Sequence, residues 1–254
     1  MTDPRALQII QLTDTHLRAE RGDTLRGVDT DATLRAVLAA IEADGLPDLF
    51  LVTGDLAEDP CAEAYERLRD LLGNTGVPVW CLPGNHDDPE LARAELNRDG
   101  LATPRARRVN GWLLVLLDST IPGEIGGELG AAELAALANT LASYPDDPAL
   151  VCLHHPPVAL GSRWIDALGL ADAGAFFGII DENPQVKAVL WGHAHQAWEG
   201  HWEDTSLLGT PSTCIQFLPG ADAFAIDEDK PPGWRRIALH PDGRVETEVR
   251  WLTQ

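Results

Sequence analysis

Six short apolar runs, each ending abruptly in Gly, Asp, Asn or His, constrain the fold of this chain more than any other feature. They are ALQIIQLTDTH (6–16), DLFLVTGD (48–55), PVWCLPGNHD (78–87), WLLVLLDS (112–119), ALVCLHHPP (149–157) and KAVLWGHAH (187–195). Continuous runs of Val, Ile and Leu of this kind are typical of strands that are buried on both faces. The sequence therefore predicts a sheet with a largely parallel component.

Segments with helical periodicity lie between these runs. Over residues 30–45, Leu34, Val37, Leu38 and Ile41 fall on one helical face, and a glycine follows as a stop. Further helix signals are N-caps at Asp59 and Asp88, each followed by proline, and periodic segments at 130–143 and 172–181. Alternating strands and helices predict a layered α/β fold.

The last fifty residues or so have a different pattern. The segments 201–217 and 233–252 alternate polar and apolar residues around turn signals such as Pro241-Asp242-Gly243. This pattern predicts hairpins, so the sheet should be mixed. With 254 residues and no internal repeat or linker composition, we expect a single domain over 1–254.

Charge is the strongest signal in the composition. The chain has 19 Lys and Arg against 40 Asp and Glu, for a formal net charge of −21. Such a surface repels polyanions, so we expect no binding to nucleic acid or to an anionic membrane. If the protein handles phosphate, a source other than a basic patch must supply positive charge, and a metal ion would do so.

The compartment is expected to be the cytoplasm. No apolar stretch is long enough to span a membrane, and the N-terminal MTDPRALQII lacks the pattern of a signal peptide. The cysteines lie far apart and form no C-x-x-C pair, so we expect reduced thiols at Cys61, Cys81, Cys152 and Cys214.

Side chains that can bind metals follow five of the six apolar runs. They are Asp14 and His16; Asp55; Asn85, His86 and Asp87; His154 and His155; and His193 and His195. Any one of these sets alone fits a hairpin turn with incidental polar residues. Their joint occurrence at one sheet edge would bury many polar groups without partners, at a cost of several kcal/mol each. Bound metal removes that cost.

The number of donors points to two ions. Two aspartates, one asparagine and four histidines are too many for one site that keeps an open position. Mixed imidazole and carboxylate ligation without thiolate suits Fe, Mn, Zn or Co, as divalent or mixed-valence ions. Two ions about 3.5–4 Å apart can clamp the attacking and leaving oxygens of a phosphoryl transfer.

The ordered motifs D-x-H, G-D, G-N-H-D, H-H-P-P and G-H-x-H, from residue 9 to about 197, resemble those of the calcineurin-like metallophosphoesterases. The segments DTHL (14–17), GTPSTCIQF (209–217) and PPGWRRIALHPDG (231–243) are similar to those of bacterial class III 3′,5′-cyclic AMP phosphodiesterases. The resemblance implies a four-layer αββα sandwich with mixed sheets and a dinuclear site at the carboxyl edge of the sheets.

The resemblance also implies a role for each site residue. Asp14, His16 and His195 would hold one ion, Asn85, His154 and His193 the other, and Asp55 would bridge both. His86 would be a catalytic histidine that is not a ligand, oriented by Asp87, and the residues expected to contact substrate are His16, Asn85, His86 and His195. The choice of His154 over His155 rests on alignment to Pro156 and stays open.

The implied activity is hydrolysis of cyclic AMP to 5′-AMP by a hydroxide that bridges the two ions. Alternatives are a hydrolase for other small phosphoesters, such as glycerophosphodiesters or phosphomonoesters, and a metal-free scaffold that binds a partner protein. The expected partner is a small cyclic nucleotide, and the expected state is a monomer or homodimer. Trp164, Trp198 and Trp234 are candidates for the base-binding wall, although packing explains each of them equally well.

Overall fold

Two six-stranded sheets face each other in the computed structural model, which describes residues 5–253. The first sheet has the order β14 (Val245–Trp251), β13 (Gly233–Leu239), β1 (Leu7–Leu12), β4 (Leu49–Thr53), β5 (Val79–Leu82) and β6 (Leu101–Ala102). The second has the order β11 (Trp198–Trp202), β12 (Thr205–Gly209), β10 (Val186–Trp191), β9 (Ala149–Cys152), β8 (Trp112–Leu116) and β7 (Ala106–Val109). β2 (Thr24–Leu25) and β3 (Val28–Asp29) form a separate hairpin.

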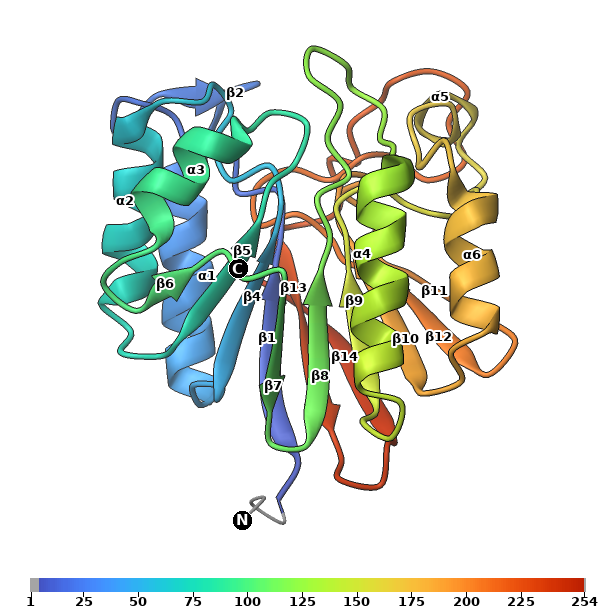
Figure 1. The fold of residues 1–254 in the computed structure, drawn as a ribbon. Coiled ribbons are helices and arrows are strands. Elements are labelled where there is room, and N and C mark those ends of the chain that lie inside the picture. The colour runs from blue at the N-terminus through green and yellow to red at the C-terminus, as the bar shows by residue number, and fades with distance from the viewer. Residues whose placement is uncertain (1–4, 254) are drawn as a thin grey trace.

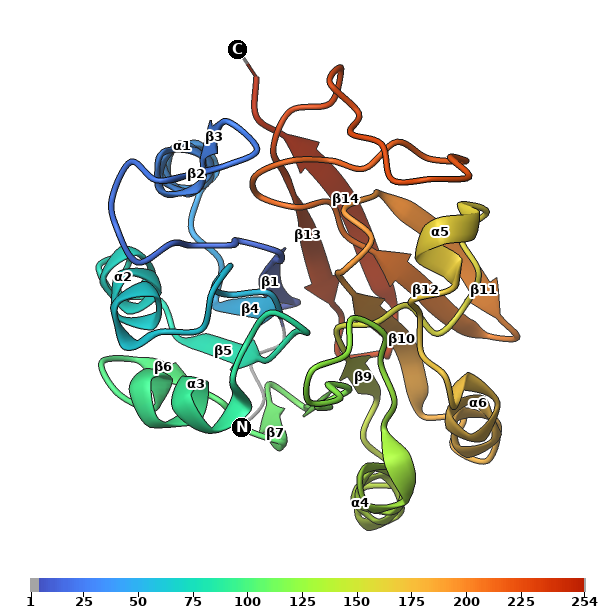
Figure 2. The same ribbon diagram turned by 90° about the horizontal axis from the view of Figure 1, so that it is seen from above.

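Helices cover the outer face of each sheet, so the molecule has the four layers that the resemblance implied (Figures 1 and 2). Over the first sheet lie α1 (Thr30–Asp44), α2 (Ala62–Gly73) and α3 (Pro89–Leu96); over the second lie α4 (Gly130–Ser143) and α6 (Ala173–Asp181), and α5 (Arg163–Asp166) is a single turn in a loop. In the described part of the chain, no helix is both long and apolar enough to cross a bilayer.

The pairing of strands confirms a mixed fold. β1, β4, β5 and β6 are parallel, as are β8, β9, β10 and β12. Antiparallel strands complete the sheets: β13 and β14 in the first, and β7 and β11 in the second. The hairpins predicted near the C-terminus are β11–β12 and β13–β14.

Burial on both faces explains why the strand sequences are continuously apolar. Consecutive residues of a strand point to opposite faces. Ile9 packs between the two sheets, whereas its neighbour Ile10 packs under the helices. Leu51 and Val52 divide in the same way. Because both faces are covered, neither position tolerates a polar side chain.

Most helix signals were read correctly. α1 ends at Asp44, just before the stop at Gly45, and Asp88 caps α3 by accepting from two backbone N–H groups. The N-cap predicted at Asp59 is wrong, because α2 begins at Ala62 after Cys61. The Glu58 N–H donates to the carbonyl of Leu17 at 3.0 Å, so the segment before Asp59 pairs with the segment that follows β1 and does not start a helix.

The cysteines are free thiols, as expected. Cys81, Cys152 and Cys214 are buried, and Cys61 is half-buried. Burial raises the pKa of the Cys214 thiol to about 12, although Ser212 lowers it in part. Burial also raises the pKa of Cys81 and Cys152, so the three buried thiols act as small apolar groups near neutral pH.

Candidate metal centre

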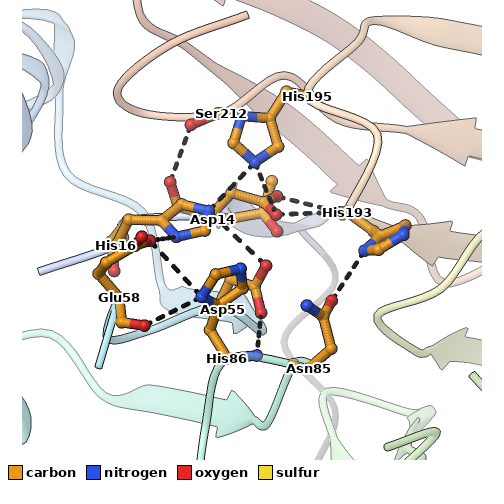
Figure 3. A network of polar contacts seen from close by, with 12 residues as sticks. Asp14, His16, Asp55, Glu58, Asn85, His86, His193, His195 and Ser212 are labelled. Carbon is orange, nitrogen blue, oxygen red and sulfur yellow. Dashed lines mark hydrogen bonds and ion pairs between the residues drawn. The ribbon is translucent and has the colours of Figure 1, made fainter. Parts of the chain in front are cut away.

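The segments that follow β1 and β4 lie side by side above the first sheet. The backbone N–H of Asp14 donates to the carbonyl of Gly54 at 3.0 Å, and that of His16 donates to the carbonyl of Asp55 at 2.9 Å. The His193 N–H, which follows β10 in the other sheet, donates to the Asp14 carboxylate at 3.0 Å. These contacts bring the ends of both sheets to one point (Figure 3).

The backbone at this point takes a conformation that L-residues rarely adopt. Five candidate ligands have positive φ: Asp14 (53°), His16 (44°), Asp55 (49°), His193 (64°) and His195 (46°). Such strain persists where the surroundings over-determine it, and it clusters at active sites. In D-x-H and in H-x-H, both outer residues share the left-handed conformation, so each short motif sends two side chains to the centre.

Two positions of the motifs require glycine, because other loops approach their backbones closely. A β-carbon on Gly84 would overlap the backbone nitrogen and carboxylate of Asp55. A β-carbon on Gly192 would overlap the hydroxyl of Thr13 and the carboxylate of Asp14. The G-N-H-D and G-H-x-H patterns therefore reflect the packing of loops from both sheets against the two aspartates.

One group of donor atoms contains Asp14, His16 and His195. Nε2 of His16 lies 3.1 Å from Nε2 of His195, which lies 3.3 Å from Oδ1 of Asp14. Donor atoms that share an ion at about 2.0–2.2 Å are separated from each other by roughly 3.0–3.5 Å in tetrahedral or octahedral geometry. The spacing fits a shared ion.

A second group contains Asn85, His154 and His193. Oδ1 of Asn85 lies 2.9 Å from Nδ1 of His193 and 3.2 Å from Nε2 of His154. Figure 3 shows the Asn85 amide directed at the His193 ring. The amide oxygen and the imidazole nitrogens have the spacing of ligands to one further ion.

Asp55 lies between the two groups. Its Oδ1 accepts from the His86 N–H at 3.0 Å, whereas its Oδ2 lies 3.6 Å from Nε2 of His16 and 3.3 Å from Nε2 of His154. One carboxylate therefore contacts a histidine of each group, as a bridging ligand must.

Three of the four histidines have their other ring nitrogen held by an acceptor outside the centre. Nδ1 of His16 faces Oε2 of Glu58, Nδ1 of His195 faces the Ile215 carbonyl, and Nδ1 of His154 faces the Thr53 carbonyl, each at 2.8 Å. A carbonyl or carboxylate oxygen requires an N–H donor. Each neutral ring therefore carries its proton on Nδ1 and presents the Nε2 lone pair to the centre, which is the arrangement of metal-bound histidines.

The charges at the centre are coupled. Burial raises the pKa of Asp55, but His154 and His16 lower it more, and the net pKa lies well below the usual range. Burial lowers the pKa of His154, but Asp55 raises it to about 9. Buried carboxylates thus attract positive charge, which either protons or metal cations can supply. Two carboxylates, an amide oxygen and four imidazoles fit transition metal ions.

The His155 ring lies beside this centre, 4.7 Å from the His193 ring, but both of its nitrogens contact other groups. Its Nδ1 lies 2.8 Å from Oγ of Ser119, and its Nε2 lies 3.1 Å from the carbonyl of Ile125. Burial and the neighbouring His154 lower its pKa to about 3, so the ring is neutral. With both nitrogens occupied, His155 anchors the 119–127 loop, and this geometry supports the choice of His154 as the donor.

His86 lies at the open side of the centre, with its side chain 36% exposed. Its Nδ1 donates to the carbonyl of Glu58 at 2.9 Å, which leaves Nε2 as the nitrogen that can exchange a proton with a ligand. Burial lowers the pKa of His86, but Asp55 and Glu58 raise it above the ordinary value. The ring can therefore carry a proton near neutral pH.

Asp87 does not orient His86, and that expectation is corrected. Its carboxylate accepts from the N–H groups of Leu56, Ala57 and Gly84 and from the hydroxyl of Tyr65, at 2.9–3.1 Å. Burial and the nearby Asp55 raise its pKa to about 6, although these amide donors lower it in part. With both oxygens engaged, Asp87 ties the loops after β4 and β5 together, and Glu58 takes over the orienting contact with His86.

Glu58 is the site residue that the sequence reasoning missed. Its Oε2 lies 2.8 Å from Nδ1 of His16 and 3.5 Å from Nδ1 of His86 (Figure 3). Burial raises the pKa of Glu58, but the hydrogen bond to His16 lowers it below the usual value. The only signal in the sequence is a carboxylate three residues after the G-D motif, in GDLAED.

A pocket of about 250 Å³ opens above the donor atoms. His16, Asp55, Asn85, His86, His193 and His195 form its floor, and Leu25, Arg26, Ile125, Trp164, Ile165, Leu168, Phe217 and Phe224 are among the residues of its walls. Of the three candidate tryptophans, Trp164 alone lines this pocket; Trp198 packs against Trp191, and Trp234 lies in the core under the helices of the first sheet. Phe217 ends the segment GTPSTCIQF that carries part of the resemblance, but nothing in the sequence indicated that Phe217 or Phe224 lines a pocket.

Comparison with known proteins agrees with the fold. Residues 7–197 match the family model described as calcineurin-like phosphoesterase, and the chain belongs to this family. A dimetal phosphatase from Danio rerio shares the fold with a TM-score of 0.67 at 14% identity, covering 99% of this chain and 100% of that one.

Curated relatives extend the similarity to nearly the full chain. The 3′,5′-cyclic adenosine monophosphate phosphodiesterase CpdA of Pseudomonas aeruginosa is 39% identical over 250 residues, which cover 98% of this chain and 90% of that protein. A 3′,5′-cyclic-nucleotide phosphodiesterase of Nostoc sp. is 36% identical over 251 residues, which cover 98% of this chain and 94% of that protein.

Proposed function

We propose that this protein is a metal-dependent phosphodiesterase that hydrolyses 3′,5′-cyclic AMP to 5′-AMP. The observation that carries the proposal is the convergence of donors from both sheets on Asp55, with His86 beside them at the open side. The similarity to cyclic nucleotide phosphodiesterases over nearly the whole chain supports this choice of substrate.

The donors divide into two half-sites. Asp14, His16 and His195 would hold one ion, Asn85, His154 and His193 would hold the other, and Asp55 would contact both. Fe, Mn, Zn or Co suits these ligands. When bound, two such ions polarise the phosphate, activate a water molecule and stabilise the charge that develops during transfer. The chain fixes the positions of the ligands, because hydrogen bonds at Nδ1 hold the rings of His16, His154 and His195.

His86 assists the leaving group. Hydrolysis forms a bond from the oxygen of water to phosphorus and breaks the bond from phosphorus to the 3′ oxygen. That oxygen needs a proton, and His86 can donate one from Nε2 because its Nδ1–H is held by the carbonyl of Glu58. The phosphate stays on the 5′ oxygen, so the product is 5′-AMP.

The net charge of −21 agrees with this function. A cyclic phosphodiester carries one negative charge and reaches an acidic protein more readily than a polyanion does. Metal cations bound by the donors of the pocket floor would supply positive charge there. That charge would attract the phosphate of the substrate to the floor. The alternative of a metal-free scaffold is disfavoured, because the chain keeps all seven donors and His86.

Incubation of metal-loaded protein with cyclic AMP, followed by chromatography, tests the proposal. We expect metal-dependent formation of 5′-AMP that a chelator abolishes. Glycerophosphodiesters and phosphomonoesters form the comparison panel. Rapid hydrolysis of that panel without any 5′-AMP from cyclic AMP would retain the hydrolase and reject the cyclic nucleotide as its substrate.

A further inference from the structure

The wall of the pocket next to the metal centre is aromatic. The ring of Phe217 stacks on the candidate ligand His195, with centroids 4.0 Å apart and an interplanar angle of 8°. Trp164 and Phe224 each lie edge-on to Phe217, at 5.2 Å, and to each other, at 5.3 Å. The aromatic wall, defined as Trp164, Phe217 and Phe224, therefore runs without a break from the centre toward solvent.

The rim of this pocket leaves large apolar side chains exposed. Phe224 is 42% exposed and Ile125 is 57% exposed, and both line the pocket. Exposed apolar groups that gather at one place on an acidic surface mark a binding site for an apolar or aromatic ligand. They come from separate loops above the strand ends, visible at the top of Figure 1.

Two polar groups accompany the aromatic wall. The guanidinium carbon of Arg26, at the tip of the β2–β3 hairpin, lies 4.6 Å from the centroid of Phe224. Nε1 of Trp164 is buried and has no acceptor among residues 5–253. A planar heterocycle with ring nitrogens can stack on the aromatic rings and accept hydrogen bonds from such donors.

We infer that the aromatic wall, with Arg26, binds the base of the nucleotide while the phosphate occupies the floor of the pocket. The inference rests on the proposed function, since it assigns a place to the part of the substrate that does not react. Among the described residues that line the pocket, Arg26 and the histidines are the only basic side chains. The wall therefore suits an uncharged purine better than it suits a second phosphate. The wall thereby sets which phosphodiesters the enzyme prefers.

Phe224→Ala is the test variant, since a side chain that is 42% exposed can be removed without opening the core. Base–aromatic stacking predicts that KM for cyclic AMP rises about 5- to 100-fold while kcat changes much less. Phe224→Tyr should keep a low KM. Tyr144→Ala is the matched control: this ring also lies beside an arginine, Arg108, at 5.7 Å, but it is outside the pocket.

Calorimetry of metal-loaded protein adds a readout that does not depend on turnover. Wild type should bind 5′-AMP more tightly than ribose 5-phosphate, and Phe224→Ala should shrink that preference. If cyclic AMP is turned over but the two ligands bind equally, or if the variant weakens both equally, the base site is rejected and the proposed function stands. If wild type does not hydrolyse cyclic AMP, both proposals are overturned.

Discussion

The floor and the rim of the pocket are built in opposite ways. The floor consists mainly of buried side chains at strand ends, such as Asp14 at 0% and His195 at 2% exposure, and hydrogen bonds set their orientations. His86, at the open side of the floor, is 36% exposed. The rim consists of loop residues such as Phe224, which keep much of their surface in solvent. The contrast indicates a division of labour, in which the floor performs phosphodiester chemistry and the rim selects what is attached to the phosphate.

Removal of Asp55 should have the largest effect, because this carboxylate touches both half-sites. We expect Asp55→Ala to lose both ions and all hydrolysis, since neither half-site keeps its shared anion. Elemental analysis gives the metal-to-protein ratio. Glu133→Gln is the matched control, a buried carboxylate that pairs with Arg105 away from the centre, and it should keep two ions. Two ions per chain in Asp55→Ala would contradict the bridging role.

A variant of His86 distinguishes catalysis from metal binding within the floor. His86→Ala should keep its metal and lower turnover of cyclic AMP by roughly 10²–10⁴, the usual scale for a general acid or base. The measurements are kcat and metal content on the same sample. Loss of metal would show that His86 is a ligand, and unchanged kcat would remove it from the reaction.

A variant of Glu58 tests whether metal binding by the floor depends on residues that orient the ligands. Glu58→Gln leaves the carbonyl contact to His86 but replaces the carboxylate that holds Nδ1 of His16. We expect metal affinity to fall about 10- to 100-fold, as for other groups that orient ligands. Competition with a chromophoric chelator measures it, with the exposed Glu63→Gln as control. Equal affinity in both variants would refute the role.

Removal of the Arg26 side chain tests the rim, and we expect it to have the smallest effect of the variants described. A cation–π contact at an exposed site is worth about 0.5–1 kcal/mol, so Arg26→Ala should raise KM for cyclic AMP about 2- to 5-fold. Metal content should match wild type, which separates rim from floor. Arg108→Ala, beside Tyr144, serves as control. A loss of metal in Arg26→Ala would break the distinction between the two regions.

The sequence by itself determined the six buried strands, the C-terminal hairpins, most of the helices and which polar residues follow those strands. Apolar runs buried on both faces can only be central strands, and α4 begins and ends where helical periodicity predicted, at 130–143. Because parallel strands end at one edge, the polar residues after five runs had to meet there. Local pattern fails at Asp59, because the Glu58 N–H pairs with the Leu17 carbonyl and α2 begins only at Ala62.

Tertiary structure alone decided how those residues divide their roles. Adjacent residues such as His154 and His155 look alike in sequence, but one faces Asp55 and the other faces Ser119. The family resemblance paired Asp87 with His86, whereas folding places Glu58 beside that ring. The sequence named Trp164 as a candidate for the base-binding wall, but only contacts between distant segments show that it packs with Phe217 and Phe224.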